Sequence, residues 1–142
     1  MTPPSITRNR RTWIWLLAPL LFVVQSLPAM AAASPACPAQ GFDSFLHRFA
    51  NDIAIQKAFV SDPLQNDTVQ QVSQQLEKAQ LSFPLMPNEQ QQAQQGLSLS
   101  KVVVGPKEVM VQLTKANTDH PLSLFFRKED CWTLYRIQND AF

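Results

Sequence analysis

The sequence predicts an α+β domain, in which an N-terminal amphipathic helix packs on a four-stranded antiparallel meander. Two observations carry this prediction. Early in the chain, apolar residues recur at intervals of three, four and seven, which gives a helix one apolar stripe. From Leu97 onward the apolar period changes to two, the spacing of side chains on one face of a strand. The stripe of the helix consists of Phe42, Phe45, Leu46, Phe49 and Ile53.

The helix is expected to begin after Gly41, with Asp43 in its first turn, where a carboxylate complements the helix dipole. Pro63 stops any continuation, because proline cannot extend a helix. Short links between successive strands favour antiparallel neighbours. One face of such a sheet needs a cover, which the phenylalanine-striped helix can supply. The four strands are expected over residues 97–104, 109–114, 122–127 and 132–137.

The middle of the chain, residues 65–95, is rich in glutamine. Asp67 and Gln70 have the spacing of a capping box, so a second helix is predicted there. Asn88 is expected to cap a short polar helix that Gly96 ends. The apolar stripe of the second helix is thin and consists of Val69, Val72, Leu76 and Ala79.

Residues 1–31 have the three parts of a cleavable signal peptide: a positive start, an apolar run and small residues at a cleavage site. The apolar run, residues 13–24, is shorter than the roughly 20 residues of a membrane span. Cleavage is expected at 31/32 or 33/34, although an uncleaved anchor helix is the alternative. Residues 32–142 then form a single secreted domain, periplasmic or released, with no membrane span. Arg10 and Arg11 also fit a twin-arginine signal, so the export route stays open.

The charge balance bears on the kind of partner. The whole chain has a formal net charge of +1, from 12 basic and 11 acidic residues. Arg8, Arg10 and Arg11 leave with the signal peptide, so the secreted domain is slightly acidic. Proteins that bind nucleic acids or anionic membranes usually carry clustered positive charge. Neither is therefore expected as a partner, whereas another envelope protein or a small ligand is.

Both cysteines, Cys37 and Cys131, lie in the secreted domain. An even pair in a small exported domain predicts a disulfide. The alternative is that both cysteines ligate a metal. A structural metal site needs further ligands, which two scattered histidines do not supply.

Three segments resemble a group of small uncharacterised bacterial secreted proteins. The first runs from Gly41-Phe42-Asp43-Ser44-Phe45 to Pro63-Leu64, the second is Phe83-Pro84-Leu85-Met86-Pro87, and the third is Cys131-Trp132-x-Leu134-x-Arg136-Ile137. The resemblance implies a cystatin-like or nuclear-transport-factor-2-like (NTF2-like) fold, a curved antiparallel sheet wrapped against a helix. It implies no activity, because the group has no agreed function.

No catalytic signature stands out in the sequence. There is no nucleophile elbow, glycine-rich phosphate loop or zinc spacing, so we expect no cofactor and no metal, and assign no catalytic residue. Asp43, His47 and Asn51 lie four residues apart on one helix face, where an Asp-His pair can act as a general base. The alternative is an exposed polar face with an ordinary intrahelical pair. His120 is expected at a loop tip.

The best candidate for a binding surface consists of Phe125, Arg127, Tyr135 and Arg136. Phe125, Arg127 and Tyr135 are expected to share one face of the sheet, opposite the face that carries Phe126 and Trp132, and Arg136 is a candidate fourth member. Tyrosine and arginine are favoured at interaction hot spots. The alternative is that the two rings pack under the glutamine-rich segment while the arginines stay in water.

These observations favour an exported, non-enzymatic binding or inhibitor-type protein. The alternative is a small hydrolase or isomerase with a cavity between helix and sheet, which predicts buried ionisable groups in that cavity. A structural envelope component without a discrete ligand is a third possibility.

Overall fold

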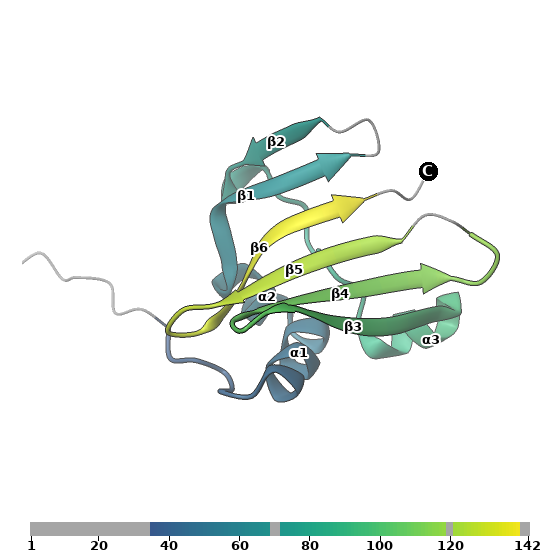
Figure 1. Ribbon diagram of the computed structural model, residues 1–142, viewed down its shortest axis with the longest axis horizontal. Coiled ribbons are helices and arrows are strands. Elements are labelled where there is room, and N and C mark those ends of the chain that lie inside the picture. The colour runs from purple at the N-terminus through teal and green to yellow at the C-terminus, as the bar shows by residue number, and fades with distance from the viewer. Residues whose placement is uncertain (1–34, 69–71, 119–120, 140–142) are drawn as a thin grey trace, which may run out of the picture. The chain divides into compact units, whose positions relative to one another are not determined.

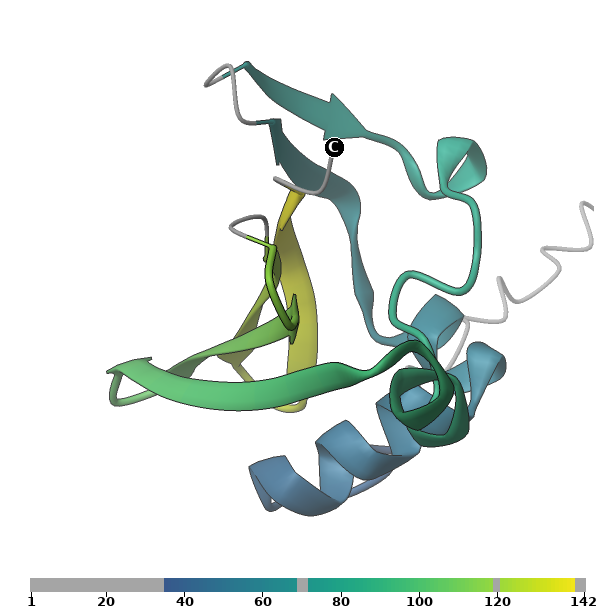
Figure 2. The same ribbon diagram turned by 90° about the vertical axis from the view of Figure 1, so that its right-hand side faces the viewer.

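A computed structural model describes residues 35–68, 72–118 and 121–139. The predicted signal peptide and His120 lie outside these residues. The described chain folds into one curved sheet with its helices on one side (Figures 1 and 2). The helices are α1 (Phe42–Asn51), α2 (Ile53–Ala58), the 3-10 helix η1 (Lys78–Gln80) and α3 (Glu89–Gln95). The strands are β1 (Val60–Thr68), β2 (Ser73–Leu76), β3 (Leu97–Gly105), β4 (Glu108–Lys115), β5 (Leu122–Lys128) and β6 (Trp132–Asn139).

The sheet has six strands in the order β2-β1-β6-β5-β4-β3. The predicted meander is present as β3 to β6, with each neighbouring pair antiparallel. The prediction of a four-stranded antiparallel sheet is nevertheless wrong in number and direction. β1 and β2 extend the sheet beyond β6, and β1 runs parallel to β6. The sheet is therefore mixed.

The helix predicted after Asp67 is also wrong. Asp67 itself lies in β1 and pairs with Ser73 of β2. Ser73–Leu76 is a strand, and the described residues that follow it form the 3-10 turn η1 at Lys78–Gln80. The predicted apolar stripe is weak, since Val72 is exposed and Leu76 alone of its members lies in the strand, so pairing with β1 decides the structure here.

The N-terminal helix forms as predicted but breaks at Asp52. This residue has an extended backbone (φ −132°, ψ 112°), and its side chain accepts a hydrogen bond from the Ala54 backbone N–H (2.7 Å), which caps α2. The break changes the helical phase. Ile53, the last residue of the predicted stripe, is therefore exposed, and Gln56 is buried.

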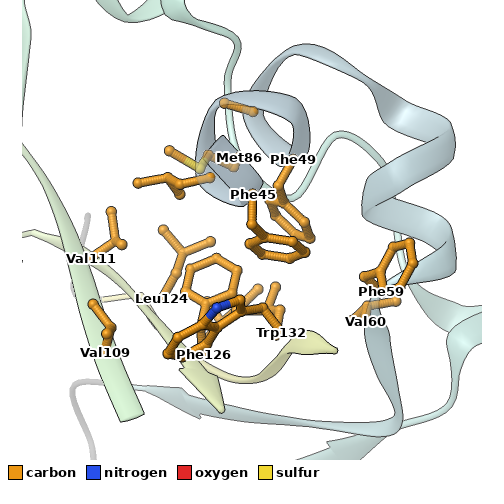
Figure 3. Packing of buried hydrophobic residues seen from close by; sticks show 14 of the residues in the cluster. Phe45, Phe49, Phe59, Val60, Met86, Val109, Val111, Leu124, Phe126 and Trp132 are labelled. Carbon is orange, nitrogen blue, oxygen red and sulfur yellow. The ribbon is translucent and has the colours of Figure 1, made fainter. Parts of the chain in front are cut away.

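The core lies between the helices and the sheet (Figure 3). Phe126 of β5 is its centre: the ring packs against Phe42, Phe45 and Phe49 of α1, with ring centres 5.2–5.8 Å apart. All three contacts are edge-to-face, a favoured geometry for aromatic pairs. The predicted cover of the sheet by the phenylalanine stripe is thus present.

Gln56 of α2 is a fully buried polar side chain. Its Oε1 accepts from the backbone N–H groups of Leu85 (2.7 Å) and Met86 (3.3 Å), and its Nε2 donates to the Met86 carbonyl (2.9 Å). Leu85 and Met86 belong to the segment before α3, which contains two prolines and has no strand partner. The bonds to Gln56 therefore supply hydrogen-bond partners for backbone N–H and C=O groups of this segment where it enters the core.

Replacing Gln56 with leucine should lower the free energy of unfolding by about 1–3 kcal/mol, because it leaves buried backbone groups unpaired. Urea unfolding followed by circular dichroism measures this change. Gln94→Leu on the exposed side of α3 is the matched control, and should change stability by less than about 0.5 kcal/mol. Equal effects of both substitutions would contradict the structural role of Gln56.

A disulfide joins Cys37 to Cys131, as predicted, with the two Cα atoms 5.4 Å apart and 94 residues apart in sequence. It fastens the segment before α1 to the turn between β5 and β6. Beside it, Lys128 Nζ and Trp132 Nε1 donate to the Gln40 carbonyl, at 3.1 and 3.3 Å. The entry to α1 is therefore held both covalently and by hydrogen bonds.

The short polar helix is also confirmed as α3. The Asn88 side chain accepts from the Gln91 backbone N–H (2.8 Å), and the Gln91 side chain accepts from the Asn88 N–H (3.0 Å), which together make a capping box. Gly96 ends the helix with φ 65°, a left-handed conformation that favours glycine. This helix places Glu89 beside α1.

Candidate functional site

Phe125, Arg127, Tyr135 and Arg136 lie together on the outer face of the sheet, and we call them the arginine–aromatic cluster. The outer face is the face opposite to that of Phe126, which packs on the helices. The Cζ atom of Arg136 lies 4.2 Å from the centre of the Phe125 ring, and that of Arg127 lies 5.0 Å from the centre of the Tyr135 ring. Each cation thus covers a ring face, which is an attractive geometry.

A β-bulge builds this cluster. Phe125 pairs with Arg136, whereas the next residue, Phe126, pairs with Leu134. Tyr135 is therefore an extra residue in β6, and it lies with Arg136 on the side of Phe125. Simple alternation would have placed the two neighbours on opposite faces. The two rings, Phe125 and Tyr135, have centres 6.5 Å apart and an interplanar angle of 62°.

Carboxylates surround the cluster. Arg136 Nε lies 2.7 Å from Asp67 Oδ2 on β1, as an ion pair whose geometry is too bent for a hydrogen bond. Arg127 Nε lies 3.3 Å from Glu129 Oε1, and both of these side chains are exposed. The Tyr135 hydroxyl donates to the Glu108 carboxylate. The cluster therefore combines fixed cations with their own counter-charges.

The protonation states follow from this environment. Burial, with the Glu108 carboxylate as its hydrogen-bond acceptor, raises the pKa of Tyr135 to about 12. Burial also acts to raise the pKa of Asp67, but hydrogen bonds from Gln65 and Ser73 and the charge of Arg136 outweigh it, so that pKa is lowered. At neutral pH, Tyr135 is thus a hydrogen-bond donor and Asp67 is an anion.

Two hollows flank the cluster. An open groove of about 290 Å³ adjoins Arg136 where β1, β2 and β6 meet. A smaller hollow of about 80 Å³ adjoins Arg127 and Tyr135. Gln65, Asp67, Thr68, Ser73, Arg136 and Gln138 line the first, and Ser61, Arg127, Glu129, Thr133 and Tyr135 line the second. A partner that binds the outer face would therefore contact polar side chains around two arginines that are stacked on aromatic rings.

The predicted stripe Asp43, His47 and Asn51 does not form an Asp-His pair. Asp43 instead pairs with Lys101 of β3 (2.6 Å), and His47 Nδ1 lies 2.8 Å from Glu89 Oε1 of α3. Hydrogen bonds from His47 and Asn51 lower the pKa of Glu89. The adjacent hollow of about 150 Å³ is lined by these four ionisable side chains and has no hydroxyl or thiol in its lining.

The interior between helices and sheet was the expected place for a hydrolase or isomerase site. Over the described residues, the buried polar side chains are Gln56, Gln92 and Ser123, and none of them is ionisable. Acid–base catalysis needs groups that exchange protons near the working pH. The enzyme alternative therefore gains no support from this core.

In residues 35–68, 72–118 and 121–139, no group of three or more His, Cys, Asp and Glu side chains is placed to hold a metal ion. None of the helices found there has the length and apolar character needed to cross a membrane.

Comparison with known proteins shows the fold. An NTF2-like protein from Bacteroides fragilis is similar over 72% of this chain, with a TM-score of 0.53 and 18% sequence identity. The fold is NTF2-like. This chain covers 48% of the Bacteroides fragilis protein, so it spans about half of that relative. The NTF2-like fold was one of the two folds that the sequence resemblance implied, and the cystatin-like alternative receives no support.

Two DUF4783 family proteins are also similar to this chain. The one from Bacteroides uniformis has a TM-score of 0.44 and 14% identity over 72% of this chain and 98% of its own. The one from Bacteroides ovatus has a TM-score of 0.43 and 12% identity over 76% and 94%. No model of a protein family and no curated protein matches the sequence. At 18% identity, the similarity to the Bacteroides fragilis protein concerns the fold and not an activity.

Proposed function

We propose that this chain is an exported binding protein, which captures another envelope protein on the outer face of its sheet. The observation that carries the proposal is the arginine–aromatic cluster, in which Arg127 and Arg136 stack on Tyr135 and Phe125. An inhibitor of an envelope-acting protein is one form that such a binding protein can take.

The cluster has the properties of a binding hot spot. Stacking fixes the guanidinium planes, so less side-chain entropy is lost when a partner binds. Guanidinium N–H groups that remain at the surface can donate to a carboxylate of the partner in a bidentate geometry. Arg127 is the more accessible of the two, with 53% of its side chain exposed against 31% for Arg136. We therefore expect Arg127 to make the first contact with an acidic surface.

The charge-reversal variant Arg127→Glu tests the site. The full chain, produced in a bacterial host, is used to capture partners from envelope extract, and the captured protein is then purified and titrated. We expect binding to weaken roughly tenfold or more, as at a hot spot. The fold should persist, because the exposed pair with Glu129 contributes little stability.

Arg48→Glu on the exposed side of α1 is the matched control and should bind like the wild type. Equal affinity of wild type and Arg127→Glu would overturn the assignment of this face. Recovery of no partner, under conditions that recover a known envelope pair, would overturn the binding function itself.

Export has its own test. After expression of the full chain, we expect the protein in the periplasmic extract or the medium, with its N-terminus at Ala32 or Ser34 by mass spectrometry. The twin-arginine route requires both arginines, so Arg10→Lys with Arg11→Lys should block export only if that route is used. A protein that stays in the cytoplasm with an intact N-terminal segment would contradict the proposal.

A further inference from the structure

β3 forms one edge of the sheet. In the strand order of the described residues it has β4 on one side and no strand on the other. An edge strand presents a row of unpaired backbone N–H and C=O groups, which are a template for another strand. β3 is nine residues long, from Leu97 to Gly105. It therefore offers a long edge rather than a short, protected one.

The same edge carries most of the exposed apolar surface. Six large apolar side chains are exposed in the part of the chain that the structure describes, and four of them lie on β3. Val103 is the most exposed, at 76%. A strand edge with exposed apolar side chains indicates a pairing site, because an added strand would bond to the free backbone groups and remove the apolar side chains from water. The four side chains are Leu99, Val102, Val103 and Val104.

A pocket of about 150 Å³ lies beside this edge, between α1, α3 and β3. Its apolar lining comes from Leu46, Ala50, Met86 and Leu99. Because Leu99 belongs to β3, the pocket is continuous with the strand edge. An engineered cavity of about this volume holds benzene, so one branched or aromatic side chain fits. In strand addition, such pockets supply specificity while the backbone supplies affinity.

The charges of the β3–β4 hairpin favour an acidic occupant. The hairpin carries Lys107 and Lys115, together with Lys101, which is paired with Asp43 of α1, against one carboxylate of its own, that of Glu108. The Glu108 carboxylate already accepts the Tyr135 hydrogen bond. A second copy of this chain would bring two such positive hairpins together, and lysine on an edge strand is a common device against self-pairing. An extended segment with acidic residues has the complementary charge.

We propose that β3 binds an extended segment of a partner protein as an added strand. The segment places one apolar side chain in the pocket between α1, α3 and β3, and its acidic residues lie near the hairpin lysines. This site is separate from the arginine–aromatic cluster, because β4 lies between β3 and the strands β5 and β6 that carry the cluster. The inference does not rest on the function proposed above.

A random dodecapeptide library, displayed on phage and selected on the disulfide-bonded protein, tests the inference. We expect enriched peptides in which acidic residues alternate with Val, Ile, Leu or Phe. One enriched peptide, synthesised and titrated by NMR, should shift the β3 amides and the Leu46 and Met86 methyl groups. Val103→Glu should weaken its binding at least tenfold, since the glutamate replaces exposed apolar surface on the edge strand and repels the acidic residues of the peptide.

Val72→Glu is the matched control, because Val72 is also exposed, at 47%, and precedes β2 at the other edge of the sheet. Val72→Glu and Arg127→Glu should both bind the peptide like the wild type. The inference is overturned if no peptide is enriched, or if the peptide binds Val103→Glu as tightly as the wild type. It is also overturned if the free protein dimerises in sedimentation and Val103→Glu abolishes the dimer, because the occupant is then a second copy.

Discussion

Replacing Phe126 with alanine should lower the free energy of unfolding by about 3–5 kcal/mol, the range for a large aromatic side chain lost from a packed core. The Phe126 ring is fully buried and contacts the rings of Phe42, Phe45 and Phe49. These rings belong to one rigid helix, so they cannot close the space that the substitution leaves. Urea unfolding of the disulfide-bonded protein, followed by circular dichroism, measures the loss.

Phe125→Ala is an informative control, because it removes the same side chain from the adjacent residue on the opposite face. Phe125 is also buried, but Arg136 and Tyr135 cover it. Arg136 is long and partly exposed, so it can move into the space, and the cost of a cavity depends on such relaxation. We expect a clearly smaller loss than for Phe126→Ala. Equal losses would show that the helix–sheet core does not dominate stability.

Removing the disulfide by Cys37→Ser with Cys131→Ser should cost about 4.7 kcal/mol, the value of the chain-entropy model for a loop of roughly 100 residues. The bridge spans 94 residues, so it restricts nearly the whole unfolded domain. Domains of this size are stable by only about 5–15 kcal/mol. We therefore expect the double variant to unfold at a much lower urea concentration, or to be partly unfolded in its absence.

The double substitution is preferable to either single one, because it leaves no free thiol to form other disulfides. Two measurements check the account. Thiol titration of the unfolded, unreduced wild type should find no free thiol. Reduction of the wild type should reproduce the stability of the double variant to within about 0.5 kcal/mol, the scatter of independent surface changes. A loss below about 1 kcal/mol would contradict the expected role of the bridge.

The strands β3 to β6 were predictable from sequence because each carries its own signal. In the second of these strands, apolar residues recur at every other position, as Val109, Val111 and Leu113, and turn residues separate the strands. The disulfide was predictable for a similar reason, since two cysteines in a small domain leave one intramolecular pairing. In these elements, local pattern and tertiary structure agree.

β1 was not predictable in this way. Its segment contains Asp62, Pro63 and Asn66, which disfavour strands, and its register with β6 shifts between Val60 and Gln65. It becomes a strand because it lies beside β6, a partner distant in sequence. The break of the helix at Asp52 was also not predictable, because the apolar stripe of the sequence continues through this residue. The hydrogen bond from the Ala54 N–H to the Asp52 side chain starts a new helix there, which changes the faces on which the following residues lie.

The candidate site was predictable in its members but not in its geometry. The residue types of Phe125, Arg127, Tyr135 and Arg136 suggested a surface, whereas the bulge that places Tyr135 and Arg136 together depends on pairing with β5. Glu89 was missed as the partner of His47, because it lies on another helix and its own neighbourhood reads as polar surface. The valines of β3 predicted a strand, but their exposure at an edge of the sheet depends on the strand order, which the sequence does not show.

The central place of β6 has a consequence for the order of folding. The chain is synthesised from its N-terminus, so β1 and β2 emerge long before β6, the strand that joins them to the rest of the sheet. A two-stranded hairpin alone is at best marginally stable in water, and α1 packs against Phe126 and Trp132, which also come late. The sheet therefore cannot be completed before β6 is available, and a chain that is still unfolded is what the proposed export through a narrow membrane channel would need. Cys131 directly precedes β6, so the Cys37–Cys131 bridge depends on the same late part of the chain.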